Sequence, residues 1–238
     1  MHRLVGSAAV LALLSTTPAA PADSLAALPD RAAVSGSSPN WVGYAINSGG
    51  YTSVESHWTQ PAVDCSQGDG TVVFWVGLDG WGSNAVEQTG TQAKCVGGAA
   101  SYSAWWETYP TNGIAGYSDS VLPGDHIYAK VTYLGASGYE LYLSDATQGW
   151  VEDGAHPGSS ASVNQSAEIV AETPSHNGNL VALPDFGTVG FTGAMINGQS
   201  LTSAGAIEIN LVRNDNTLAA TSELVNGIDF TVNWQRNS

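Results

Sequence analysis

From Trp41 onward the chain follows a two-residue hydrophobic period, and this feature limits its possible folds more than any other. Apolar and polar side chains alternate over residues 126–133, 139–143 and 228–234, whereas residues 71–77 form one continuous apolar run. Alternation is typical of a strand with one buried face, and a continuous run is typical of a strand buried on both faces. No strong helical period follows the first residues of the chain. The pattern therefore predicts an all-β protein.

Short clusters of glycine, asparagine, proline and serine separate the predicted strands at intervals of about ten residues. They lie at residues 47–50, 68–70, 97–98, 123–125, 135–138, 177–178 and 197–198. Short strands with regular turn signals predict an antiparallel sandwich or barrel. The sequence shows no internal repeat and no long linker after residue 40, so we predict that residues 40–238 form a single β-sandwich domain.

The residues before position 40 resemble targeting and connecting segments. Residues 1–22 combine a positive start, a short apolar run and a small-residue cleavage site, which predicts a secretory signal peptide. The apolar run is too short to span a bilayer. Residues 23–39 are small, polar and proline-bearing, and we interpret them as a linker or a short pro-segment. A disordered or buried N-terminal helix is the alternative; otherwise we expect a secreted, extracellular protein.

Secretion gives the only two cysteines, Cys65 and Cys95, a structural interpretation. In an oxidising compartment a single pair predicts one disulfide. It would close a loop of about 30 residues and stabilise the fold by roughly 3 to 4 kcal/mol if chain entropy alone is counted. Two cysteines lack the four ligands of a structural zinc site, and the five histidines show no ligand-like spacing. We therefore predict neither a metal site nor a cofactor.

The charge of the chain excludes two classes of partner. The sequence holds 21 acidic and 6 basic residues, with a formal net charge of −15 at pH 7. A nucleic-acid-binding protein needs a basic stripe to displace counterions, and a polybasic membrane anchor needs clustered lysine or arginine. After residue 40 the bases are Lys94, Lys130, Arg213 and Arg236. We expect no nucleic-acid or membrane partner, and few salt bridges that acid could break.

Polar residues on the predicted strands supply the candidates for chemistry. A period of two places Trp105, Glu107 and Tyr109 on one face of a strand, and Glu168 with Glu172 on one face of another. A carboxylate such as Glu168, within an apolar strand, is either exposed on a solvent face or held in a groove. The sequence contains no G-x-S-x-G elbow, P-loop, H-E-x-x-H or D-[ST]-G signature, so none of these common catalytic motifs assigns a function to the chain.

Five short motifs match one known family in order and spacing. They are Asn40-Trp-Val-Gly43, Trp75-Val-Gly-Leu-Asp-Gly80, Glu87-Gln-Thr-Gly90, Ala104-Trp-Trp-Glu-Thr-Tyr-Pro110 and Ala167-Glu-Ile-Val-Ala-Glu172. Each is weak alone, but the ordered set, which covers roughly residues 40–232, resembles the eqolisins, or glutamic peptidases. The resemblance implies a sandwich of two long antiparallel sheets, of the concanavalin or jelly-roll kind.

The resemblance also assigns roles to individual residues. It implies a catalytic dyad of Gln88, from the Q-T-G motif, and Glu168, from the A-E motif. It further implies that Trp41, Trp75, Asp79 and Glu107 line or support the cleft. Trp105 and Tyr109 share the predicted strand face of Glu107, so we add them to the candidate cleft. Fungal members tend to carry leucine where this chain has Glu87, and their cysteines differ, so the disulfide is not carried over.

These residues suggest how a peptide bond would be hydrolysed. Glu168 would take a proton from water as a base and return it to the leaving nitrogen as an acid, while the amide of Gln88 would stabilise the oxyanion. An unperturbed glutamate has a pKa of about 4.3, so such a base works in acid. We therefore predict a secreted, acid-active endopeptidase that acts as a monomer on polypeptide substrates.

Two alternatives stay open at this point. An aromatic-rich secreted β-sandwich is also typical of carbohydrate-binding modules, in which Trp81, Trp105 and Trp106 would stack on sugar rings. A glycosidase would use Glu107 and Glu168, with their carboxyls about 5 to 10 Å apart. In that case Gln88 would have no catalytic role.

Overall fold

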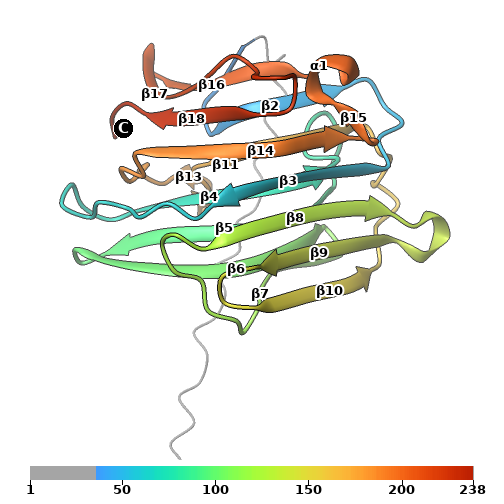
Figure 1. Ribbon diagram of the computed structural model, residues 1–238, viewed down its shortest axis with the longest axis horizontal. Coiled ribbons are helices and arrows are strands. Elements are labelled where there is room, and N and C mark those ends of the chain that lie inside the picture. Colours follow the sequence, from blue (N-terminus) through green and yellow to red (C-terminus); the bar gives the residue numbers. More distant parts are fainter. Residues whose placement is uncertain (1–35, 238) are drawn as a thin grey trace, which may run out of the picture.

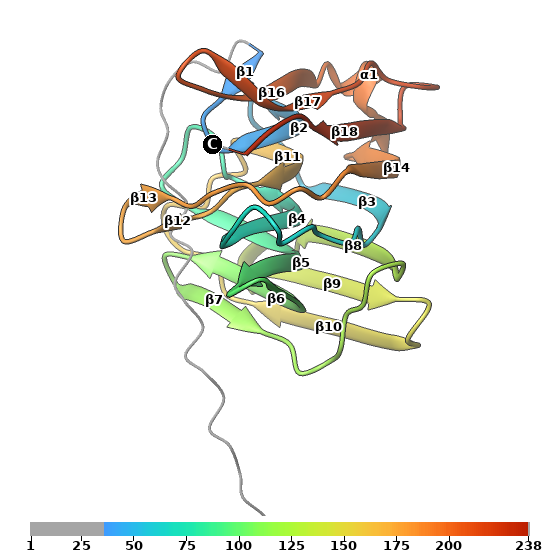
Figure 2. The same ribbon diagram turned by 90° about the vertical axis from the view of Figure 1, so that its left-hand side faces the viewer.

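Two antiparallel layers of strands face one another in the computed structural model, which describes residues 36–237 (Figures 1 and 2). The first layer runs in the order β10 (Trp150–His156), β9 (Tyr139–Asp145), β8 (His126–Tyr133), β3 (Ser53–Thr59), β14 (Thr188–Ile196), β18 (Phe230–Trp234) and β17 (Asn216–Thr221). The second layer runs in the order β2 (Trp41–Asn47), β11 (Ser166–Glu172), β4 (Gly70–Leu78), β5 (Val86–Val96), β6 (Ala99–Tyr109) and β7 (Asn112–Gly116). The predicted all-β antiparallel sandwich is confirmed.

One strand joins the two layers by hydrogen bonds. β16 (Ile207–Arg213) pairs with β17 of the first layer and with β2 of the second, so the two predicted sheets are parts of one sheet that folds back on itself. The remaining elements are short: β1 (Ser37–Ser38), which pairs with β16; β15 (Gln199–Ser200), which pairs with β14; the hairpin of β12 (Ser175–His176) and β13 (Asn179–Leu180); the helix α1 (Leu201–Ala204); and the 3-10 turn Gly135–Ser137.

The main hydrophobic core lies between the layers, and a second apolar cluster lies on the outer face of the second layer. β4 contributes to both, because Phe74 points inward whereas Val73 and Trp75 point outward. Every residue of β4 is buried, which explains why its sequence is continuously apolar. β8 instead alternates between buried and more exposed positions, because only one of its faces meets the core.

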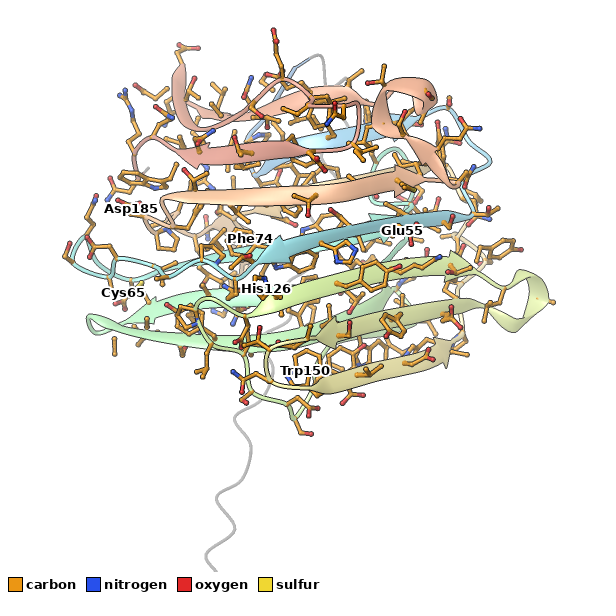
Figure 3. All side chains as sticks on the ribbon, viewed as in Figure 1. Glu55, Cys65, Phe74, His126, Trp150 and Asp185 are labelled. Carbon is orange, nitrogen blue, oxygen red and sulfur yellow. A yellow bond between two sulfur atoms is a disulfide. The ribbon has the colours of Figure 1, made fainter. Side chains whose placement is uncertain are left out.

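Cys65 and Cys95 form the predicted disulfide, with the two sulfurs 2.03 Å apart. The bond ties the segment that precedes β4 to the last residues of β5, at the end of the sandwich where Figure 3 labels Cys65. It joins residues 30 positions apart, which is the loop size on which its expected stabilisation rests.

The predicted signal peptide at residues 1–22 lies outside the described residues, as does most of the segment at 23–39. The end of that segment pairs with the sandwich, because Ser37 and Ser38 lie opposite Asn210 and Leu211 of β16. Within the described chain, no helix is long and apolar enough to cross a membrane.

Candidate active site

Three polar side chains and one glycine form a row across four adjacent strands of the second layer. Glu168 of β11 lies opposite Gly77 of β4. Gly77 in turn lies opposite Gln88 of β5, which lies opposite Glu107 of β6. Residues directly opposite one another in a sheet share a face. The row therefore shares the outer face with the apolar cluster around Trp75, on the side away from the viewer in Figure 3.

Gly77 adds no side chain of its own between the two predicted catalytic residues. Neighbouring strands are about 4.8 Å apart, so the backbones of Glu168 and Gln88 are separated by about 10 Å across β4. An added Cβ at Gly77 would lie 2.7 Å from the ring of Trp75 and 3.0 Å from the Cβ of Gln88. The packing of its neighbours therefore requires glycine at this position.

We expect Gly77→Ala to lower the free energy of unfolding by about 1 to 3 kcal/mol, because the added methyl forces Trp75 and Gln88 out of position. Urea unfolding at acid pH, followed by far-ultraviolet circular dichroism, measures the change. Gly113→Ala is the matched control, since an added Cβ at Gly113 of β7 meets no atom within 4 Å. Equal stability of the two variants would contradict the packing argument.

Glu107 holds the amide of Gln88 in place. Gln88 Nε2 donates a hydrogen bond to Glu107 Oε2 at 2.6 Å, and both side chains are buried. Burial raises the pKa of Glu107 to about 8, against the hydrogen bond from Gln88, which lowers it. The bond uses one of the two amide protons of Gln88, and its Oε1 has no partner. One amide proton and the amide oxygen are thus left for a ligand.

Glu168 is fully buried and incompletely hydrogen-bonded. Its Oε2 accepts a long bond of 3.4 Å from the backbone N–H of Gly80, and its Oε1 has no partner. Burial, followed by the nearby charge of Asp79, raises the pKa of Glu168 to about 8 despite hydrogen bonds that lower it. The sequence alone predicted an ordinary pKa, which is wrong here because the strand pattern does not reveal burial of the outer face.

The far end of β11 carries a second buried carboxyl, for which the sequence predicted a face but no partner. Glu172 Oε1 accepts a hydrogen bond from Asn40 Nδ2, and its Oε2 accepts one from Trp75 Nε1, both at 3.0 Å. Burial raises the pKa of Glu172 to about 7. The sequence signal for this contact was slight: Asn40 directly precedes Trp41 in the first motif. Glu172 thus fixes the ring of Trp75 beside the row.

The predicted cleft tryptophans gather in one cluster next to the row. Trp41 meets Trp75 edge to face, with ring centroids 5.4 Å apart, and Trp105 belongs to the same cluster. All three are nearly fully buried. Tyr109 lies at the end of β6 and is 39% exposed, so it stands at the margin of the site.

Asp79 supports a loop instead of lining the row. Its carboxylate accepts hydrogen bonds from the backbone N–H groups of Val163, Asn164 and Gln165, at 2.9, 2.8 and 2.6 Å. These residues lead directly into β11, so Asp79 anchors the strand that carries Glu168. Asp79 itself has a φ of 70°, in the left-handed region that aspartate tolerates better than most residues.

The sequence model of the peptidase A4 family matches residues 39–234. The chain belongs to this family. It is therefore a glutamic endopeptidase, and the resemblance to the eqolisins is confirmed. Aspergillopepsin-2 of Aspergillus niger is 28% identical to it over 221 residues, an alignment that covers 83% of this chain and 78% of that protein.

Solved structures of glutamic peptidases share the fold of this A4 family member. Scytalido-glutamic peptidase with a transition state analog inhibitor matches with a TM-score of 0.73 at 21% identity, over 83% of this chain and 98% of that one. Aspergilloglutamic peptidase from Aspergillus niger matches with a TM-score of 0.61 at 28% identity, over 69% and 99% of the two chains.

The family assignment decides against both alternatives from another class. The geometry agrees with this decision. Glu107 is hydrogen-bonded to Gln88 and lies three strands away from Glu168 in the row, so the two carboxyls do not form a facing pair.

Among residues 36–237, no group of three or more histidine, cysteine, aspartate or glutamate side chains is arranged to hold a metal ion.

Proposed function

We propose that this peptidase is an acid-active endopeptidase in which Glu168 and Gln88 act as the catalytic dyad. The observation that carries the proposal is the row on the outer face of the second layer, in which these two side chains flank Gly77. Each also has a buried oxygen without a partner: Oε1 of Glu168 and Oε1 of Gln88. Buried polar atoms without partners are rare in folded proteins, and their clustering marks a place where water or substrate binds.

The proposed reaction begins with a water molecule at Oε1 of Glu168. The ionised carboxylate takes one proton from this water, and the resulting hydroxide forms a bond to the carbonyl carbon of the substrate. The protonated carboxyl then gives its proton to the amide nitrogen, the carbon–nitrogen bond breaks, and the carboxylate is restored. A carboxylic acid and an amine leave the site.

Gln88 stabilises the oxyanion that forms between these steps. Its amide does not exchange protons at any useful pH, but its second N–H is free to donate to the negative oxygen. The bond from Nε2 to Glu107 fixes the direction of that N–H before substrate arrives. Such preorganised donors act without the reorganisation that water would need.

The pH range follows from the burial of Glu168. In the closed site the neutral carboxyl is favoured, so in acid the residue starts with its proton. Water that enters with the substrate solvates the carboxyl and returns its pKa toward the ordinary value of about 4.3. The base therefore becomes available in moderate acid.

Gln88→Ala tests the assignment of the oxyanion donor. We expect kcat for a peptide substrate at acid pH to fall by about 10²- to 10³-fold with little change in KM, because the donor acts mainly in the transition state. Gln92→Ala is the matched control, since Gln92 lies on the same strand and face but opposite Val73, outside the row. Equal activity of Gln88→Ala and Gln92→Ala would contradict the assignment of the dyad.

The compartment and assembly are also part of the proposal. We propose cleavage of a signal peptide at residues 1–22, secretion of a monomeric domain at 40–238, and a linker or pro-segment role for 23–39. The Cys65–Cys95 disulfide supports an oxidising compartment. N-terminal sequencing and light scattering of protein from the culture medium test these points; a retained residue 1 or a dimer would contradict them.

A further inference from the structure

Glu87 has a buried carboxyl that the proposed reaction does not use. It lies next to Gln88 on β5 but faces the interior of the sandwich, and it is fully buried. The hydroxyl of Ser162 donates a hydrogen bond to its Oε1 at 2.6 Å, while its Oε2 has no donor.

A second carboxyl acts on Glu87. Asp79 lies beside it as a hydrogen-bond partner and as a negative charge. Two carboxyls form a hydrogen bond only if one of them keeps a proton. Both oxygens of Asp79 already accept backbone N–H bonds, three in all, so the hydrogen shared by the two carboxyls is placed on Glu87. Burial, the largest cause, raises the pKa of Glu87 to about 8.

The groups that face Glu87 offer no positive charge. Asp79 comes from the end of β4 and Tyr139 from the start of β9, and Ser162 comes from the loop that precedes β11. The Tyr139 hydroxyl donates to Asn164 Oδ1 at 2.7 Å, so it is already engaged with the same loop. Within the described chain, no cation contributes to the environment of Glu87. Ionised Glu87 would therefore place an uncompensated second charge beside Asp79.

This buried group is linked to Glu168 along two short paths. Through Ser162 it contacts the loop at residues 159–165, which runs straight into β11. The second path runs through Asp79, whose backbone N–H donates a hydrogen bond to the carbonyl of Ser166, the first residue of β11, at 3.1 Å. The next residue, Gly80, donates to Glu168 itself. Two paths of contacts therefore join Glu87 to the residues on either side of Glu168.

We propose that Glu87 is a positioning residue, which as a neutral acid bridges Ser162 and Asp79 and so holds the loop at 159–165 and the adjoining Glu168 in place. When Glu87 loses its proton, repulsion from Asp79 opens the bridge and loosens the start of β11. The proposal rests on the proposed function only where it names Glu168 as catalytic; the protonated bridge itself does not depend on peptidase activity.

Glu87→Gln provides the test, because glutamine imitates the neutral acid: its oxygen accepts from Ser162 and its amide donates to Asp79. Hydrogen–deuterium exchange at residues 159–168, measured at pH 4 and pH 7, reports the loop directly. We expect wild type and Glu87→Gln to exchange equally at pH 4. At pH 7 we expect the variant to exchange at least about tenfold more slowly, since it has no proton to lose. Glu223→Gln, at an exposed position, should behave as wild type.

A second variant separates the bridge from simple loss of charge. Glu87→Leu cannot hydrogen-bond, so we expect faster exchange at 159–168 than in Glu87→Gln at pH 4 as well as at pH 7. The pH profile of peptide hydrolysis should extend to higher pH in Glu87→Gln than in wild type. The proposal would be overturned if Glu87→Gln exchanged as fast as wild type at pH 7, or if that variant failed to fold at pH 4. Retained hydrolysis in Gln88→Ala would contradict the catalytic dyad but would not change the expected exchange result, so the two proposals fail separately.

Discussion

We expect Glu168→Gln to lose peptide hydrolysis at acid pH by about 10²- to 10⁴-fold in kcat. Glutamine has nearly the same shape as the neutral acid but neither takes a proton from water nor returns one to the leaving nitrogen. The glutamine side chain also keeps an oxygen that can accept the hydrogen bond from the Gly80 N–H. The loss should therefore reflect chemistry and not a damaged fold.

The measurement compares purified wild type and Glu168→Gln on one peptide substrate between pH 2 and pH 7, with circular dichroism to confirm folding. Glu223→Gln is the control, because it removes the same charge from an exposed position. A Glu168→Gln enzyme with full activity would refute the assignment of the base. Combination with Gln88→Ala should lower kcat by less than the product of the two single effects, because residues of one catalytic unit are not additive.

We expect the folded state to be most stable in acid and to lose stability as the pH rises above about 4.5. Four buried carboxyls cause this: the pKa values of Glu87, Glu107 and Glu168 are raised to about 8, and that of Glu172 to about 7. In the unfolded chain each would titrate near 4.5. Between these limits the folded state holds protons that the unfolded state has released, so a rise in pH favours unfolding.

The magnitude of this effect is large compared with the stability of a domain. Between its pKa in the unfolded state and its pKa in the folded state, each such carboxyl lowers the free energy of unfolding by up to about 1.4 kcal/mol per pH unit. The whole free energy of unfolding of a domain is about 5 to 15 kcal/mol. We therefore expect unfolding, or opening of the site to water, before the pH reaches about 8. The upper pH limit of activity is then a limit of the fold.

Denaturant unfolding at half-unit steps from pH 3 to pH 8 measures this dependence. Replacing Glu87 by glutamine should flatten the slope above pH 4.5, because one of the four protons is no longer linked to folding. Glu223→Gln should leave the slope unchanged. A free energy of unfolding that is constant between pH 4 and pH 7 would show that these carboxyls are not held neutral.

The proposed acid activity has support beyond the composition. The sequence indicated it through 21 acids and 6 bases, which leave little positive self-repulsion when carboxylates are protonated. The structure adds that several of the acids are buried together without a counter-charge, Glu107 and Glu168 among them. Such groups favour acid through their protons, whatever the net charge of the surface.

Local patterns in the sequence were enough to predict the strands, the sandwich, the disulfide and the face on which each candidate side chain lies. Glu168 and Glu172 share one face, and Glu87 and Gln88 lie on opposite faces, because side-chain direction in a strand depends only on the alternation of neighbouring residues. The ordered motifs added the family, and they are the source of the proposal that Gln88 and Glu168 form the dyad.

Only the tertiary structure decided which strands lie side by side. β11 is inserted between β2 and β4, and this pairing of distant segments brings Glu168 into one row with Gln88 across Gly77. The same pairing buries Glu168 and joins Glu87 to Asp79 and Ser162. Strand order and register depend on contacts between residues far apart in the chain, and pKa values depend on the burial those contacts create, so neither is written in the local period.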